Sequence, residues 1–213
     1  MKQLKLLLIG MVGIFSLSTS YAQRVGVGAE ISYIRPNPQY EFGFTLKSAP
    51  GIAITTRSSN EYRFRWGVSL GYVPFKTTMD VFPTFAYESD GGKDVYYPGE
   101  ERLKNNRYHF FYGAGIGEFK ILETPLSPII GLDFRINFSS YTLISHFAEN
   151  PHHAGDNEES FNDISLSLVP KVGVVYDLED FSFLLTAGYN WDFVPKNKFP
   201  YTTVSFSIIY YFE

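Results

Sequence analysis

Apolar and polar positions alternate along most of this chain. Between Arg24 and Ile34 every second residue is apolar, and glycine or polar residues occupy the positions between. The same period of two returns in six further segments, at residues 63–72, 107–117, 130–138, 164–176, 181–191 and 202–212, and a less regular segment lies at 41–57. Segments of about 9 to 11 residues with this period are typical of tilted strands that span a membrane. The pattern predicts eight antiparallel strands, the second of which contains Pro50 and is expected to begin late.

The identity of the two faces predicts which one points outward. In the third segment Phe64, Trp66 and Leu70 share one face, and arginine, serine and glycine share the other. Glycine and serine suit a narrow interior, so we place the large apolar residues outside. The same rule gives the orientation of the fourth segment. It places outside Tyr108, Phe110, Tyr112, Ala114 and Ile116, and it places His109 and Gly113 inside.

The connections alternate in length. Short turns are expected at 58–61, 122–127 and 178–180, and long polar segments at 78–106 and 141–162, with shorter ones at 35–40 and 195–198. Transmembrane barrels have short periplasmic turns and longer external loops, with an even number of strands. The chain is therefore predicted to be all-β, an eight-stranded antiparallel up-and-down transmembrane β-barrel.

Aromatic residues are predicted to form two belts, one at each membrane interface. The inner belt comprises Phe64, Phe119, Tyr176, Phe181, Tyr210 and Phe212, and the outer belt comprises Tyr33, Tyr72, Tyr108, Phe138, Tyr189 and Trp191. The alternative is a soluble β-sandwich or lipocalin-like barrel, whose strands also alternate. Its core would have to hold all of these aromatic residues at once.

The first 22 residues have the three parts of a secretory signal. Lys2 and Lys5 precede an apolar run from Leu6 to Leu17, and Ser20-Tyr21-Ala22 forms a small-x-small cleavage site. The run is shorter than the roughly 20 apolar residues of a spanning helix. We expect cleavage before Gln23, which leaves 23–213 as a single outer-membrane β-barrel domain.

Charge and cysteine content exclude some classes of protein. Two of the 18 basic residues and none of the 22 acidic residues lie in the signal, so the remaining chain has a net charge of −6. That balance argues against nucleic acid as a partner. There is no cysteine, although export leads to an oxidising compartment. The fold must therefore be stabilised without disulfides.

The chain resembles the small outer-membrane β-barrel families of the OmpX/OmpA-barrel and PorT-like kind. The resemblance rests on the order of signal, Val25-Gly-Val-Gly-Ala-Glu30 strand, Arg63-Phe-Arg-Trp-Gly-Val-Ser-Leu-Gly-Tyr72 segment and aromatic-ended last strand. It implies residence in the outer membrane with its lipid bilayer and insertion by the barrel-assembly machinery. That machinery would recognise Phe212, although Glu213 follows it here.

Charged residues fall on the predicted inner face of several strands. They are Glu30, Arg63, Arg65, Asp133, Arg135 and Lys171. An eight-stranded barrel is just wide enough for side chains to fill it, and enclosed charges must be paired or hydrated. We expect an internal charge network that fills the barrel; the alternative is a narrow polar conduit.

The histidines offer little chemistry. His109 is expected to point inward, away from lipid, which disfavours a lipid-modifying enzyme. His146, His152 and His153 share a segment with Asp156, Glu158 and Glu159, a composition that fits either a solvated acidic loop or a weak metal site. Gly113-Ala-Gly115-Ile-Gly117 lacks the spacing and the helix of a nucleotide fingerprint, and we expect these glycines to make room inside the barrel. No cofactor is indicated.

The first long polar segment is rich in aromatic residues. Phe82, Phe85, Tyr87, Tyr96 and Tyr97 interleave with acidic residues. They are expected to cap the barrel mouth, extend the strands, or contact a protein partner. The leading hypothesis is a non-enzymatic barrel that acts as a structural or surface-contact protein. The alternatives are a subunit of an envelope transport or secretion assembly, a lipid-modifying enzyme, and a soluble ligand carrier.

Overall fold

The computed structural model describes residues 24–37, 45–58, 63–90, 93–147, 156–193 and 199–212, and the side chains of all of these except 86–90 and 93–95. The signal segment, its cleavage site, His152, His153, Glu213 and the connection at 195–198 lie outside these ranges. The signal and the single mature domain stay predictions. In the described part of the chain no helix is long and apolar enough to cross a membrane.

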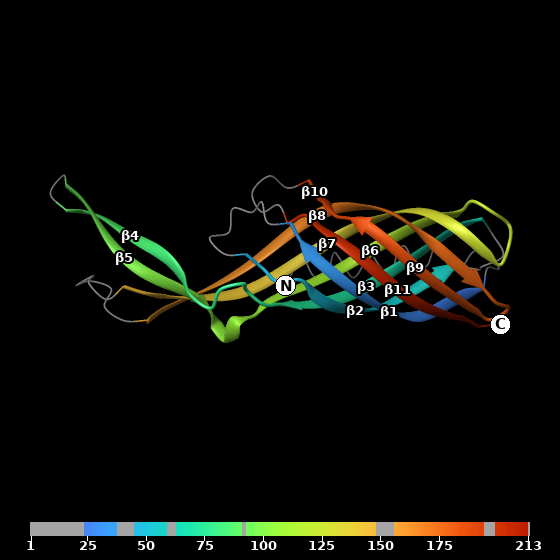
Figure 1. The fold of residues 1–213 in the computed structure, drawn as a ribbon, viewed down its shortest axis with the longest axis horizontal. Helices are drawn as coiled ribbons and strands as arrows, with labels where there is room; N and C mark the ends of the chain where they lie inside the picture. The colour runs from blue at the N-terminus through green and yellow to red at the C-terminus, as the bar shows by residue number, and fades with distance from the viewer. Residues whose placement is uncertain are drawn as a thin grey trace, which may run out of the picture.

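Eight long strands form the barrel wall (Figure 1). They are β1 (Val25–Pro36), β2 (Ala49–Ser58), β3 (Phe64–Phe75), β6 (Tyr108–Lys120), β7 (Leu126–His146), β8 (Asp156–Asp177), β9 (Phe181–Tyr189) and β11 (Tyr201–Tyr211), with the two-residue β10 (Trp191–Asp192) after β9. Each pairs antiparallel with its neighbours in chain order, apart from the hairpin inserted after β3. The prediction of eight antiparallel strands is confirmed, and the second strand does begin late, at Ala49.

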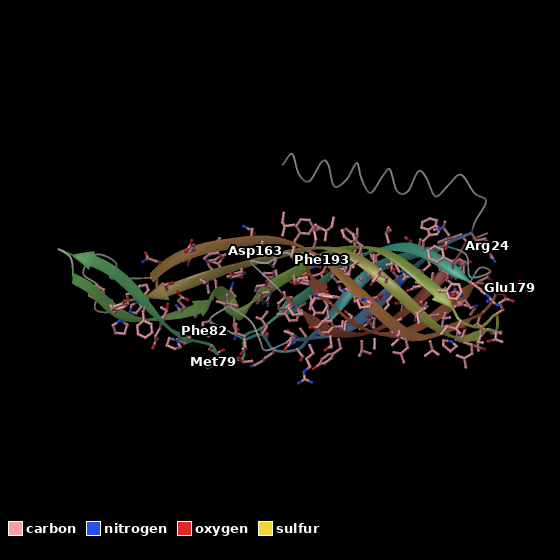
Figure 2. The ribbon with its side chains drawn as sticks, turned by 90° about the horizontal axis from the view of Figure 1, so that it is seen from above. Arg24, Met79, Phe82, Asp163, Glu179 and Phe193 are labelled. Atoms are coloured by element: carbon pink, nitrogen blue, oxygen red, sulfur yellow. The ribbon has the colours of Figure 1, made fainter. Side chains whose placement is uncertain are left out.

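The barrel closes because its first and last long strands pair. Eleven residue pairs join β1 to β11, from Gly26 with Tyr211 to Pro36 with Tyr201. Because the first and last strands pair, neither is left as an open edge, as a barrel in hydrocarbon requires. The connections β6–β7 and β8–β9 lie at one end, as do the last residue of β2 and the first residue of β3, and this end is called the turn end. Figure 2 shows Arg24 and Glu179 together at that end.

The described parts of the two long polar segments are largely strand, which corrects the prediction of long loops; extension of the strands was one of the three expectations for the first segment. Residues within 78–106 form a hairpin of β4 (Phe82–Asp90) and β5 (Lys93–Leu103), followed by the short 3-10 helix η1 (Lys104–Asn106). β7 continues to His146 and β8 begins at Asp156, and β5 pairs with the far end of β7. β4, β5 and the ends of β7 and β8 that extend beyond the barrel form one sheet, called the projecting sheet, at the left of Figure 1. The opposite end of the barrel from the turn end is called the hairpin end.

A face was predicted for seven barrel strands; six of them present it outward, but β6 does not. Tyr108, Phe110 and Tyr112 are almost fully buried in the interior, whereas Phe111 is 45% exposed on the outside. The prediction was wrong because it equated the apolar face of a strand with the lipid-facing surface. Near the hairpin end the interior is itself apolar, so both faces of β6 carry aromatic residues there.

The outer surface of the barrel is apolar over its whole circumference. Residues such as Ile31, Ile52, Leu132 and Val172 are about half exposed or more, and Figure 2 shows side chains directed away from the wall along both edges of the barrel. The six residues of the predicted inner belt are each at least 40% exposed. In the outer belt Tyr108 is the exception, since it lies inside, and Phe111 takes the outward position on β6.

Candidate functional site

Five charged residues form a continuous network across the interior. Arg57 donates from Nε and Nη2 to the two oxygens of Glu118, at 3.0 and 3.2 Å. Lys171 Nζ lies 2.7 Å from oxygens of both Glu118 and Asp133. Arg135 donates to Asp133 at 2.9 Å. These five residues, which are called the central network, come from β2, β6, β7 and β8, and each is buried, with at most 8% exposed. Each buried charge therefore has an opposite charge against it, which offsets the cost of desolvation.

A second group of charges lies nearer the turn end. Asp177 accepts from both Arg65 and Lys120, and Ser182 donates to the same carboxylate. Arg63 was expected inside with Arg65, and this is wrong. It lies just before β3 in an exposed ion pair with Glu123, at 2.6 Å. The alternation does assign Arg63 to the inner face. Because β3 begins at Phe64, however, Arg63 lies beyond the end of the wall and is exposed.

Glu30 lies inside the barrel but outside the ion-pair network. Its carboxylate accepts hydrogen bonds from Ser207 at 3.0 Å and from Tyr112 at 3.4 Å. The ring of Tyr112 in turn lies 4.5 Å from the guanidinium carbon of Arg135. A cation over an aromatic face is a favourable contact when both are desolvated. Tyr112 therefore links Glu30 to the central network.

An aromatic cluster fills the interior at the hairpin end. Phe75, Tyr108, Phe110, Phe199 and Tyr201, called the mouth cluster, have ring centroids 5.4 to 6.3 Å apart in their contacts. Tyr201 also accepts a hydrogen bond from Arg135 at 3.0 Å, which joins the cluster to the charges below it. Aromatic rings at these distances pack with favourable edge and offset geometries.

The cluster continues upward into the projecting sheet. Tyr141 stacks on Tyr108 at 5.2 Å and on Phe161 at 5.1 Å. Burial raises the pKa of Tyr141 to about 12, because the phenolate would lose its hydration. Phe82 and Leu103 of the hairpin are 2% and 4% exposed and belong to the same apolar core. The interior and the base of the projecting sheet thus share one core.

The predicted aromatic surface divides into buried and exposed members. Phe82 is buried at the base of β4, near the label in Figure 2, whereas Phe85 and Tyr96 are 69% and 64% exposed. Tyr97 is half-buried, and the side chain of Tyr87 lies outside the described residues. Two large aromatic side chains therefore face solvent on neighbouring strands of the hairpin.

His109 points outward rather than inward, as a consequence of the reversed face of β6. Its Nδ1 lies 2.8 Å from the hydroxyl of Tyr72, and the two rings stack. The inward direction can therefore no longer count against lipid chemistry. The described contacts of His109 nevertheless include no hydrogen bond to a serine or a carboxylate, which a general base would need for nucleophilic catalysis.

Acidic residues on the projecting sheet pair with basic neighbours. Asp156 lies 3.1 Å from His146 and 3.5 Å from Arg102, and Glu158 lies 2.6 Å from Lys104. The described residues contain no group of three or more side chains that could hold a metal ion. An arginine beside Asp156 also competes with any cation for that carboxylate.

The glycines of β6 do not make room inside the barrel. Gly115 faces outward, and a Cβ there would meet nothing within 4 Å. On β3, Gly71 has the expected role, since a Cβ there would lie 2.2 Å from the ring of Tyr112. β6 is a continuous strand over 108–120, without the helix that a nucleotide fingerprint needs.

Sequence reasoning missed five charged residues of the interior, which are Arg57, Glu118, Lys120, Asp177 and Asp192. Arg57 lies in the least regular segment, and Glu118 and Lys120 lie on the face of β6 that was expected outside. Asp177 ends β8, next to a predicted turn. For Glu118 and Lys120 a signal was available, because two charges on a lipid-facing surface would be costly. That cost favours the opposite orientation of β6, with Glu118 and Lys120 inside the barrel.

Comparison with known proteins shows the fold. No protein-family model and no curated protein matches the chain. Among solved structures, Neisserial surface protein A superposes with a TM-score of 0.52 at 13% identity, over 88% of this chain and 97% of that one. A major outer membrane protein of Thermus thermophilus gives a TM-score of 0.46 at 13% identity, over 88% of this chain and 99% of that chain. The N-terminal β-barrel domain of Pseudomonas aeruginosa OprF gives a TM-score of 0.44 at 11% identity, over 89% of this chain and 99% of that chain. The chain therefore has the fold of the small outer-membrane β-barrels, as the sequence resemblance predicted, and identity at this level concerns the fold alone.

Proposed function

We propose that this protein is a non-enzymatic barrel of the bacterial outer membrane, whose projecting sheet contacts a partner outside the cell. Residence in a bilayer is supported by the apolar outer surface, because isoleucine, leucine and phenylalanine side chains exposed around a whole barrel suit hydrocarbon and not water. Insertion by the barrel-assembly machinery, with Phe212 exposed after the last strand, belongs to the same proposal.

The observation that carries the surface role is the contrast between the two parts of the molecule. The central network and the mouth cluster lie across the interior of the barrel, which disfavours conduction as the main function. The projecting sheet, by contrast, holds Phe85 and Tyr96 exposed on strands that are anchored by buried Phe82. Exposed aromatic residues on a rigid support are typical of binding surfaces.

The proposal is tested by replacing residues 82–103 with a short turn. In cells that produce the native chain, external proteinase K should cut the hairpin, and these cells should adhere to one another or to an epithelial cell layer more than cells with an empty vector. The shortened chain should still insert and show the heat-dependent shift in gel mobility of a folded barrel, but adhesion should fall to the vector level. Equal adhesion by both chains, or a hairpin protected in intact cells, contradicts the surface role.

A lipid-modifying enzyme and an assembly subunit are the competing functions. Replacing His109 by alanine separates the first, because an enzyme would alter the lipid profile of the outer membrane and a non-enzymatic barrel would not. A stoichiometric protein that copurifies in mild detergent with both the native and the shortened chain would favour an envelope assembly held through another surface.

A further inference from the structure

The seam between β2 and β3 is held by a much shorter ladder than its neighbours. Four residue pairs join these strands, from Ile52 with Tyr72 to Thr55 with Ser69, whereas 12 pairs join β3 to β6. On one side of the short ladder lies Pro50, which has no backbone N–H to donate. Among the described strands of the wall, the backbone ladder is therefore shortest at this seam.

Side-chain hydroxyls replace main-chain partners on the other side of the ladder. The backbone N–H of Val68 donates to Oγ1 of Thr56 at 3.2 Å, and that of Trp66 donates to Oγ of Ser58 at 3.1 Å. These bonds satisfy the backbone of β3 without a continuous ladder. Side chains thus hold the two strands together beyond the four paired residues.

The outer surface of the barrel is hollowed over this seam. A groove of about 580 Å³ has walls of large apolar side chains, among them Ile31, Ile52, Leu70 and Phe111, and small residues such as Ala29 and Gly113. Ile31, Ile52 and Leu70 are each more than half exposed, so the groove opens to the outside. Its volume lies in the range of sites that bind small molecules.

We propose that this groove seats one acyl chain of a membrane lipid, an inference that rests on the bilayer location proposed above. Most of the lining continues the apolar surface of the barrel, and the hydroxyl of Tyr72 is already bonded to His109. Glu30 and Tyr112 also line the groove, but both are buried and their polar atoms are bonded to each other, and Glu30 also to Ser207. A peptide segment would bring backbone N–H and C=O groups that this lining could not satisfy. An acyl chain has no such groups, and the small residues let it approach the wall and gain dispersion contacts.

Two matched variants test whether the groove binds an acyl chain. Ala29→Trp places a large apolar side chain in the groove, and Ala187→Trp makes the same change at an outward position of β9, beside Val172 and Val204. Both residues are exposed on the outer surface, so both variants should fold. Ala29→Leu provides a milder filling if the tryptophan variant fails to show the heat-dependent gel shift.

Native mass spectrometry gives the readout. Each protein is reconstituted in vesicles of phosphatidylethanolamine and phosphatidylglycerol, transferred to detergent micelles and analysed for retained phospholipid. The native chain and Ala187→Trp should retain one lipid, and Ala29→Trp should retain roughly tenfold less, because it displaces several buried methylene groups.

Three results would overturn the proposal. They are a native chain that retains no lipid, retention by Ala29→Trp that equals the native level, and retention that requires one of the two headgroups when each lipid is used alone. If instead no folded protein is recovered from carbonate-washed vesicles, the bilayer location itself fails, and that outcome is distinct from an empty groove on a folded, membrane-held barrel.

Discussion

Arg57 and Glu118 form a two-point ion pair across the interior, with nitrogen to oxygen distances of 3.0 and 3.2 Å. They lie on β2 and β6, which are separated in the wall by β3. The strand between them carries Gly67, where a Cβ would lie 3.1 Å from Cδ of Arg57 and 2.0 Å from the carbonyl oxygen of Thr56. The pair therefore depends on a strand that presents no side chain at that level.

Removing the charge of Glu118 should destabilise the barrel strongly. Glu118→Gln leaves Arg57 without its carboxylate partner and takes one of two from Lys171. Breaking a buried ion pair on one side costs about 3–5 kcal/mol. Urea unfolding of the protein in vesicles, followed by tryptophan fluorescence, measures the loss.

Glu123→Gln is the control for that change. Glu123 is 71% exposed in its pair with Arg63, so its replacement should lower the free energy of unfolding by no more than about 1 kcal/mol. Similar losses for the two variants would mean that the interior is hydrated enough to screen its charges.

Two glycine substitutions should differ because of the face on which each residue lies. Gly71→Ala puts a Cβ 2.2 Å from the ring of Tyr112, which holds Glu30 and Arg135 in place, and overpacking of this kind costs about 1–3 kcal/mol. Gly115→Ala meets open space and should change stability by no more than roughly 1 kcal/mol, in the stabilising direction. Unfolding midpoints in urea separate the two. If Gly115→Ala were the damaging change, the orientation of β6 described here would be wrong.

Phe82 and Phe85 provide a matched pair in the hairpin. Phe82→Ala removes a buried ring from the shared core, and a loss of about 3–5 kcal/mol is expected for such a change. The hairpin should then be cut faster by trypsin at Lys93 and Arg102, whereas Phe85→Ala, at a side chain 69% exposed, should leave the rate of cleavage unchanged. Equal protection of both variants would show that the projecting sheet does not depend on its aromatic base.

The filled interior predicts an absence of channel activity. In planar bilayers the native chain should give no sustained conductance steps, because the mouth cluster and the central network occupy the interior one above the other. Arg135 joins the two through Tyr201, so Arg135→Ala should loosen this junction and raise the frequency of brief openings above the native level. Regular, long-lived steps from the native protein would contradict the filled interior.

The sequence alone determined the number of barrel strands, their antiparallel order and the outward face of six of them. A side chain in a strand points to the opposite face from its neighbour, so a period of two is a local property that the residues themselves reveal. Short turns between such segments then leave few ways to connect them. The residues 82–103 escaped this reasoning because their polar composition hid a hairpin, whose pairing depends on the continuation of β7 beyond the barrel.

Only the tertiary structure decided which side of β6 is inside and which charges meet. Both faces of that strand carry aromatic residues, and the choice between them depends on whether the interior at that level is apolar, which no single strand records. Arg57 and Glu118 are 61 residues apart, and their contact follows from strand register and barrel closure. Such contacts depend on the register of several strand pairs at once, whereas the alternation of faces is a property of a single strand.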